Sequence, residues 1–256
     1  MIDPTAVIDP GAELASDARV GPYTIIGPDV VIGAGTTIGP HVVINGPTRI
    51  GSDNRIYQFA SIGDAPQDKK YAGEPTRLEI GDRNTIREFV TINRGTVQDA
   101  GVTSLGNDNW IMAYAHIAHD CRIGDQTIFA NNASLAGHVR IGDYVILGGF
   151  TLVHQFCAIG SHALTAFGSG ISKDVPPFMT VGGSPARAFG LNMEGLRRRG
   201  FSQDSRMALK RAYKTLYREG RQFEDALEQL RLQAAGDPNV AVMVAFLEKQ
   251  TRGIVR

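Results

Sequence analysis

The sequence has no excess of charge of either sign and no long apolar run. It carries 26 Lys and Arg residues against 26 Asp and Glu residues, so no global basic surface predicts binding to nucleic acid or to an anionic membrane. No segment approaches the roughly 18 consecutive apolar residues of a membrane-spanning helix. Because the opening residues MIDPTAVIDP already follow the repeat described below, we expect no signal or transit peptide.

What the sequence does contain is a strict six-residue repeat. An aliphatic residue occupies every sixth position of the first part of the chain: Ile2, Ile8, Leu14, Val20, Ile26, Ile32, Ile38, Ile44, Ile50, Ile56 and Ile62. Apolar residues recur about every 3.6 positions in a helix and every 2 in a strand, so neither explains this spacing. Hexapeptide repeats are typical of a parallel β-helix, with three repeats in each triangular coil of about 18 residues. We expect the aliphatic side chains to fill the interior.

Cysteine is scarce, with only Cys121 and Cys157 present. Each follows an aliphatic repeat position by four residues, which places both at a small inward corner position on the same face. They lie two coils apart, roughly 9–10 Å at the spacing of β-strands. A disulfide spans at most about 7 Å between Cα atoms. We therefore predict two reduced thiols in the core, which is consistent with the cytoplasm.

The repeat is interrupted twice. The first interruption, residues 63–79, contains two prolines and two glycines, and the second covers residues 95–104. The aliphatic frame then continues to Ile171, and we expect the prolines within residues 174–187 to close the solenoid. Long loops that leave a rigid scaffold are usually functional, so these two loops are candidates for the site.

Beyond the repeat the periodicity becomes that of helices. One helix is predicted with Ser202 as its N-cap and Gly220 as its stop. Two more follow, the last beginning at Asp237 in the cap-then-proline order that helices favour. The sequence thus predicts a mainly β protein. A left-handed parallel β-helix of hexapeptide repeats covers residues 1–190, and a small C-terminal α-helical domain covers residues 191–256.

Five of the six histidines fall within the second half of the repeat. They are His116, His119, His138, His154 and His162. His119 occupies an outward position, and one and two coils further on come Gly137 and Gln155, so the three form a ladder on one face. A glycine beside the histidine leaves space for a ligand to lie along the coil.

Three interpretations of this histidine cluster are open. In the first, one histidine takes a proton from a substrate hydroxyl while a carboxylate or carbonyl holds its other nitrogen. In the second, His116 and His119, three residues apart, bind zinc. In the third, the solenoid has a purely structural or binding role.

Six segments carry a resemblance to a known family. They are residues 56–76, 91–98, 113–121, 131–139, 152–156 and 192–202. With them the chain resembles, over essentially its whole length, the UDP-N-acetylglucosamine 3-O-acyltransferases of lipid A biosynthesis. The segments AHIAHDC and EGLRRRGF are specific together, whereas the hexapeptide repeat alone indicates a broad class of acyltransferases.

The resemblance implies an activity and a quaternary structure. An (R)-3-hydroxyacyl group would pass from acyl carrier protein to the 3-position of UDP-N-acetylglucosamine, in a homotrimer with clefts between neighbouring β-helices and without a metal or cofactor. His119 would be the general base and Asp120 would support the protonated imidazole. The backbone N–H of Gly137 would stabilise the oxyanion.

The resemblance also implies a set of substrate-binding residues. They are Gln67, Asp68, Lys70, Asn93, His116, His138, His154, Gln155, Asn192, Glu194, Arg198 and Arg199. The loop residues would bind the sugar, with Gln67 near the acyl chain. The last four would hold the nucleotide, because the planar guanidinium fork suits a diphosphate. An acidic carrier protein would need a basic patch, which Lys and Arg residues of the helical domain are candidates to supply.

One position departs from the family pattern. Asn93 stands where the family usually has histidine, and unlike histidine it cannot carry charge. This leaves open whether the acceptor carries a 3-hydroxyl or a 3-amino group. One alternative is therefore a related UDP-sugar N-acyltransferase, although the separate N-terminal domain of that enzyme has no counterpart before Ile2. A second alternative is a zinc enzyme like the β-helical carbonic anhydrases.

Phe167 is the candidate for the residue that limits the length of the acyl chain. It aligns with the residue that closes the far end of the acyl groove in the family, and it forms an outward ladder with Asn131 and Gly149. It lies about 2.7 coils beyond His119, roughly 13 Å along the axis. An extended chain rises about 1.25 Å per carbon. The sequence therefore predicts a preference for donors of about ten carbons.

Overall fold

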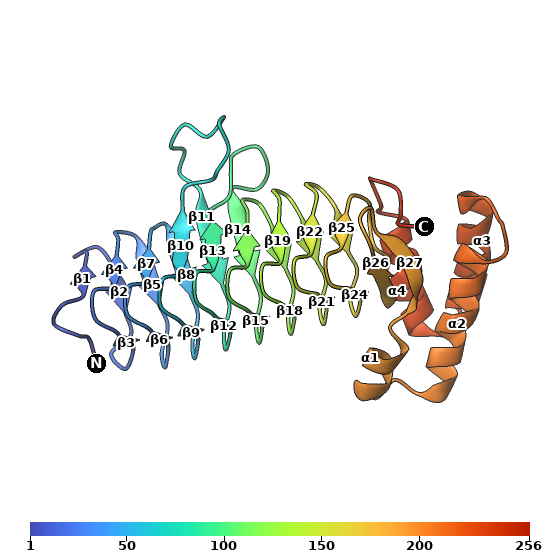
Figure 1. The fold of residues 1–256 in the computed structure, drawn as a ribbon, viewed down its shortest axis with the longest axis horizontal. Helices are drawn as coiled ribbons and strands as arrows, with labels where there is room; N and C mark the ends of the chain where they lie inside the picture. The colour runs from blue at the N-terminus through green and yellow to red at the C-terminus, as the bar shows by residue number, and fades with distance from the viewer.

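The computed structural model describes residues 1–256, and most of the chain forms one elongated left-handed parallel β-helix with four helices at its C-terminal end (Figure 1). Strands of two to five residues stack into three sheets, one on each side of the triangular coil. The first sheet contains β1 (Val7–Ile8), β4 (Ile25–Ile26), β7 (Val43–Ile44), β10 (Ser61–Asp64), β13 (Thr91–Asn93), β16 (His116–Ile117), β19 (Ser134–Leu135), β22 (Leu152–Val153) and β25 (Gly170–Ile171).

The other two sheets have the same coil-to-coil order. The second contains β2 (Glu13–Leu14), β5 (Val30–Ile32), β8 (Thr48–Ile50), β11 (Arg77–Ile80), β14 (Val102–Leu105), β17 (Arg122–Ile123), β20 (Arg140–Ile141) and β23 (Ala158–Ile159). The third contains β3 (Arg19–Val20), β6 (Thr37–Ile38), β9 (Arg55–Ile56), β12 (Thr85–Ile86), β15 (Trp110–Ile111), β18 (Ile128–Phe129), β21 (Ile146–Leu147), β24 (Leu164–Thr165), β26 (Met179–Gly182) and β27 (Arg187–Leu191).

The six-residue period translates directly into the register of the sheets. Each strand pairs in parallel with its equivalent in the next coil, so that Ile117 lies over Leu135 and Leu135 over Val153. These side chains are almost fully buried, which confirms the predicted interior. The two cysteines also lie in this core as free thiols, as predicted. Burial raises the pKa of Cys121 to about 12 and that of Cys157 to about 11, which keeps both protonated and unreactive.

The two interruptions of the repeat become loops that project side by side from the middle of the solenoid (Figure 1). The first loop, residues 65–76, joins β10 to β11, and the second, residues 94–101, joins β13 to β14. The second loop is shorter than the predicted 95–104. Its last part forms β14, because Val102 already pairs with Arg77 of the neighbouring coil.

The solenoid does not simply end at the prolines of residues 174–187. β26 adds one more strand to the third sheet, and β27 turns back on it in the only antiparallel pair. The helices follow: α1 (Met193–Arg198), α2 (Gln203–Tyr217), α3 (Phe223–Ala234) and α4 (Pro238–Leu247). Ser202 and Asp237 cap α2 and α4 as predicted, but α2 ends at Tyr217, before Gly220. None of the four helices is long and apolar enough to span a bilayer.

Asp174 ties the C-terminal segment to the last coils of the solenoid. Its buried carboxylate accepts hydrogen bonds from the backbone N–H of Ala158 at 2.7 Å and of Thr251 at 3.0 Å. Its own backbone N–H donates to Gly253, and its carbonyl accepts from Val255. Asp174 therefore holds a segment that follows it by 77 residues in the sequence against the last coils.

We expect Asp174→Ala to lower the free energy of unfolding by about 1–3 kcal/mol, because the part-buried N–H groups of Ala158 and Thr251 lose a charged acceptor. Chemical denaturation followed by circular dichroism measures the change. Glu228→Ala, at an exposed helical position, is the matched control and should stay within about 0.5 kcal/mol of wild type. Equal stabilities of the two variants would show that the Asp174 carboxylate does not hold the segment.

Candidate active site

The two projecting loops and one edge of the solenoid enclose a groove of about 530 Å³. Its lining includes Gln67, Asp68, Lys69, Lys70, Gln98, His119, His138, Gln155 and Phe156. Six of the predicted site residues therefore meet in one place, although the loop and the two histidine coils are separate in the sequence. Gln98 joins the two loops by donating a hydrogen bond to Asp68 at 3.1 Å.

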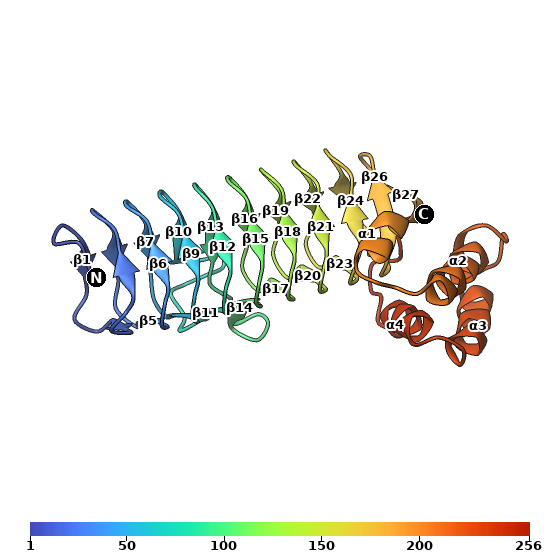
Figure 2. The same ribbon diagram turned by 90° about the horizontal axis from the view of Figure 1, so that it is seen from below.

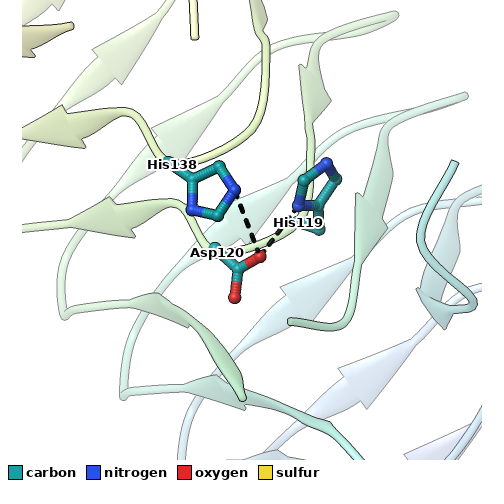
Figure 3. Close-up of side chains that lie close together, drawn as sticks. All are labelled: His119, Asp120 and His138. Carbon is teal, nitrogen blue, oxygen red and sulfur yellow. Dashed lines mark hydrogen bonds and ion pairs between the residues drawn. The ribbon is translucent and has the colours of Figure 1, made fainter. Parts of the chain in front are cut away.

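His119 and Asp120 form a dyad at the centre of this site (Figure 3). The Nδ1 atom of His119 lies 2.8 Å from Oδ2 of Asp120, while its Nε2 has no partner within the chain. The imidazole points outward from the coil as predicted, yet only 15% of the side chain is exposed because it sits within the groove. A carboxylate that holds one ring nitrogen leaves the other available to accept a proton.

Asp120 is buried and held by the second loop. Thr96 donates to it twice, from the backbone N–H to Oδ1 at 2.9 Å and from the hydroxyl to Oδ2 at 2.7 Å. Burial by itself would raise the pKa of Asp120, but the hydrogen bonds from His119 and Thr96 outweigh it and hold the pKa below its ordinary value. The carboxylate is therefore ionised at neutral pH, as a partner for imidazolium must be.

Gly137 provides the space in which the His119 ring lies. A Cβ atom at this position would come within 2.5 Å of Cε1 of His119 and 2.7 Å of its Nε2. The sequence predicted that this glycine leaves room for a ligand, whereas the imidazole itself fills that room. The backbone N–H of Gly137 donates to no acceptor within the chain, so this donor beside Nε2 is free for an oxygen of a bound substrate.

His138 is the second histidine of the cluster. Its ring meets that of His119 edge to face at 5.1 Å and stacks on Phe156 at 4.4 Å. Its Nε2 lies 3.8 Å from Oδ2 of Asp120, and its Nδ1 lies 3.5 Å from Asp99. His138 therefore stands between two carboxylates and lines the groove. Figure 3 shows its ring beside the carboxylate of Asp120.

His116 lies apart from this cluster. Its Nδ1 is hydrogen-bonded to the hydroxyl of Thr91 at 2.7 Å, across the pairing of β13 with β16. Burial, and after it the nearby His119, lowers the pKa of His116. His116 does not belong to the group of ligand residues whose atoms lie close enough together to hold a metal ion.

A different trio could hold a metal ion. Ligand atoms of His119, Asp120 and His138 all lie within 4.8 Å of one another. Two of these atoms, however, already share the 2.8 Å hydrogen bond of the dyad. A metal ion would have to displace that bond.

Asn93 does not line the groove but lies buried at the base of the first loop. Its Nδ2 donates to the carbonyl of Ala65 at 2.9 Å. The neighbouring Arg94 donates to the carbonyls of Gly46 and Gly63 and to the hydroxyl of Tyr71. These two side chains hold the loop that carries Gln67, Asp68 and Lys70.

The residues predicted to hold a nucleotide gather elsewhere, on α1 at the C-terminal end of the solenoid (Figure 1). Asn192 caps this helix and donates to the carbonyl of His162 at 3.0 Å. Glu194 forms ion pairs with Arg197 and Arg198. Arg199 lies over the ring of Tyr144, 4.9 Å from its centroid. None of them lines the groove around His119 in the same chain.

His154 and Phe167 lie outside the groove as well. His154 is exposed, with Nδ1 3.1 Å from the carbonyl of Gln155. Phe167 is 76% exposed and is the most exposed aromatic side chain of the protein. Its ring lies over Gly149, where a Cβ would meet it at 3.5 Å, which confirms the ladder expected from the repeat.

The second loop contributes residues to the site that the repeat pattern did not predict. Thr96, Gln98 and Asp99 were not singled out, although they contact Asp120, Asp68 and His138 respectively. They lie where the repeat is broken, so no periodicity indicates which way their side chains point. The only available signal was that the segment interrupts the solenoid shortly before the histidines.

We expect Thr96→Val to lower kcat about tenfold with little change in KM. It removes one charge-assisted hydrogen bond to Asp120, so the carboxylate loses part of its hold on the imidazole. Steady-state kinetics measures the effect, and Thr96→Ser, which keeps the hydroxyl, should restore most of the rate. If Thr96 only stabilises the fold, kcat should fall in each variant only in proportion to the fall in its melting temperature.

Comparison with known proteins agrees with this architecture. The family described as UDP N-acetylglucosamine O-acyltransferase, domain 2, matches residues 174–255, and the bacterial transferase hexapeptide family matches residues 103–137. An acyl-[acyl-carrier-protein]–UDP-N-acetylglucosamine O-acyltransferase of Thiobacillus denitrificans is 63% identical over 100% of this chain and 99% of its own. The protein of the same name from a Janthinobacterium strain is 62% identical with equal coverage.

Solved structures extend the likeness to three dimensions. The chain matches LpxA from Acinetobacter baumannii with a TM-score of 0.98 and 50% identity, over 100% of this chain and 99% of the other. It matches the UDP-N-acetylglucosamine acyltransferase of Francisella novicida with a TM-score of 0.99 and 44% identity, over 100% and 94%. On this evidence the chain belongs to the family of acyl-[acyl-carrier-protein]–UDP-N-acetylglucosamine O-acyltransferases.

Proposed function

We propose that this protein transfers an (R)-3-hydroxyacyl group from acyl carrier protein to the 3-hydroxyl of UDP-N-acetylglucosamine, the first step of lipid A biosynthesis. The observation that carries the proposal is the dyad. His119 presents a free Nε2 in a groove while a buried carboxylate holds its Nδ1. The relatives named above are O-acyltransferases, so neither the nitrogen acceptor nor the zinc enzyme is favoured.

In this mechanism Nε2 of His119 removes the proton of the sugar 3-hydroxyl as its oxygen attacks the thioester carbonyl. The resulting imidazolium is stabilised by Asp120, which also fixes the tautomer. The negative oxygen of the tetrahedral intermediate accepts a hydrogen bond from the N–H of Gly137. When the intermediate collapses, the C–S bond breaks and His119 returns the proton to the leaving thiolate. The products are the acylated sugar and the free thiol of the carrier.

The remaining roles follow from the groove. Asp68 and Lys70 bind the sugar hydroxyls, Gln67 lies towards the acyl chain, and His138 and Gln155 contact the sugar. Asp68 suits this role because the backbone N–H of Lys70 and, more weakly, Gln98 lower its pKa and keep it ionised. Asn93 supports these residues from below by holding the loop.

The nucleotide-binding residues are supplied by a neighbouring subunit of a homotrimer. Two features support this arrangement. The groove and α1 are separate within one chain, and the outward ladders of His119 and Phe167 lie on different sides of the coil, so a single cleft needs two chains to combine them. A threefold axis parallel to the solenoids brings the two sides together. His116 and His154 would then contact the substrate from the same cleft.

We expect the purified protein to sediment as a particle of three times the 27.6 kDa chain mass at micromolar concentration. Analytical ultracentrifugation measures this. If the protein is a monomer at that concentration, the cleft between subunits does not form, and the proposed nucleotide site is wrong.

The decisive assay combines UDP-N-acetylglucosamine with a series of (R)-3-hydroxyacyl carrier thioesters. We expect the acylated sugar nucleotide and free carrier thiol in equal amounts. The corresponding 3-amino sugar nucleotide is the control acceptor and should react much more slowly. If only the amino sugar reacts, the acceptor assignment is wrong, and if neither reacts, the enzyme assignment is wrong.

Three further assignments belong to this proposal. Residues 1–190 are the acyltransferase domain and residues 191–256 a helical domain, supported by a separate apolar cluster among the helices. The basic residues of that domain would receive the acidic carrier: Arg197, Arg206, Lys210, Arg211, Lys214 and Arg218. A cytoplasmic location is supported by the two unpaired buried thiols.

A further inference from the structure

A second cleft, of about 470 Å³, lies between α4 and the outer face of the second sheet, on the coils of β17, β20 and β23. Figure 2 shows α4 beside the end of this sheet, on the same side of the solenoid. The cleft contains neither His119 nor any loop residue of the groove described above. A concave, largely apolar site of this size with a few polar groups is what small-molecule sites usually present.

One end of the cleft is strongly basic. Arg122 and Arg140 stand directly opposite each other in the pairing of β17 with β20, a placement that is unfavourable for like charges. Asp99 forms an ion pair with Arg122 at 3.0 Å, but Arg140 has no carboxylate partner. Lys249, just beyond α4, lines the same cleft and is also unpaired. Three cations thus line one cleft, and only Arg122 among them has a carboxylate partner.

The rest of the lining includes apolar side chains on both walls. Val242 and Phe246, four residues apart on α4, line one wall, and Ala158 and Pro177 line the opposite side. Val242 is 45% exposed although it is aliphatic. Residues four apart lie on one face of a helix, so these two side chains form one apolar strip along this wall of the cleft.

We propose that this cleft binds a single-chain amphipathic anion, with its phosphate or carboxylate head on Arg140, Arg122 and Lys249 and its alkyl chain along Val242 and Phe246. The guanidinium fork of Arg140 has free donors for two oxygens of such a head. A bound anion also relieves the repulsion between the two arginines. Each methylene that leaves water strengthens binding by about fourfold, so the chain and the head together outbind either part alone.

The test is calorimetric titration of the full-length protein, without acyl transfer substrates, with decyl phosphate, decanoate, inorganic phosphate and decanol below their aggregation limits. We expect decyl phosphate or decanoate to bind at least about tenfold more tightly than phosphate and decanol. The two acids distinguish a phosphate head from a carboxylate head. Equal affinity for decyl phosphate and phosphate, or for decyl phosphate and decanol, would overturn the proposal.

Two variants separate this cleft from any acyl chain bound near His119. Arg140→Gln removes the unpaired cation, and Val242→Asp places a charge on the apolar wall at an exposed position that tolerates it. Each should weaken decyl phosphate binding about tenfold or more. Val242→Asp should also leave acyl transfer unchanged, because Val242 lines neither the groove nor the neighbouring pocket in which Arg140 lies with Asp120 and His138. Arg49→Gln, on the same outward face but in earlier coils, is the matched control and should bind as wild type does. Unchanged binding in both test variants would place the ligand elsewhere and refute the assignment, whatever the catalytic activity proves to be.

Discussion

His119→Ala is expected to lower kcat by about 10²–10⁴, the usual contribution of a positioned general base. Without the imidazole, no group takes the proton from the sugar hydroxyl, and the hydrogen bond to Asp120 is lost. The fold should persist, because the side chain points away from the core into the groove between the loops. Single-turnover measurements with the carrier thioester would report the chemical step directly.

Two other histidines serve as controls for this variant. His116→Ala should weaken activity less, since His116 is bonded to Thr91 and does not line the groove. His154→Ala removes an exposed imidazole outside the groove and should retain the chemical step. A His119→Ala enzyme that keeps most of its kcat would mean that His116 or a water molecule is the base.

Phe167→Gly is expected to change the preference for acyl length by about 10²-fold in favour of a fourteen-carbon over a ten-carbon donor. We place the exposed Phe167 ring at the far end of the acyl groove, where it stops the chain. Removing it opens room for about four more methylenes, each worth about 0.8 kcal/mol when buried. The ratio of kcat/KM for the two donors, measured in one competition assay, gives the shift.

A graded series tests whether size at this position sets the length. Phe167→Leu should give an intermediate preference, and Phe89→Gly, which removes an exposed aromatic ring from an earlier coil, should leave the preference unchanged. Sedimentation of each variant checks whether the trimer persists. This control separates an effect on acyl length from an effect on the packing of subunits around Phe167. A wild-type preference for fourteen carbons, or an unchanged ratio in Phe167→Gly, would show that the acyl chain is measured by another residue.

The solenoid and the orientation of its side chains could be predicted from the repeat alone. A strict period of six leaves only one way to bury every aliphatic residue, so the frame fixes the register from coil to coil. That is why the burial of Cys121, the outward position of His119 and the stacking of Phe167 on Gly149 could all be predicted and were found. The helix caps at Ser202 and Asp237 could also be predicted, because capping depends only on residues that are adjacent in the sequence.

The way in which the loops complete the site depends on long-range contacts that no local pattern indicates. Residues 65–76 and 94–101 have no period, so their paths are set by contacts with distant coils, such as those of Arg94 with Gly46 and Gly63. The same contacts bring Thr96 onto Asp120 and Asn93 beneath the first loop. A repeat specifies which residues of successive coils stack on one another. A loop that interrupts the repeat takes its conformation from its contacts with the surface of the solenoid.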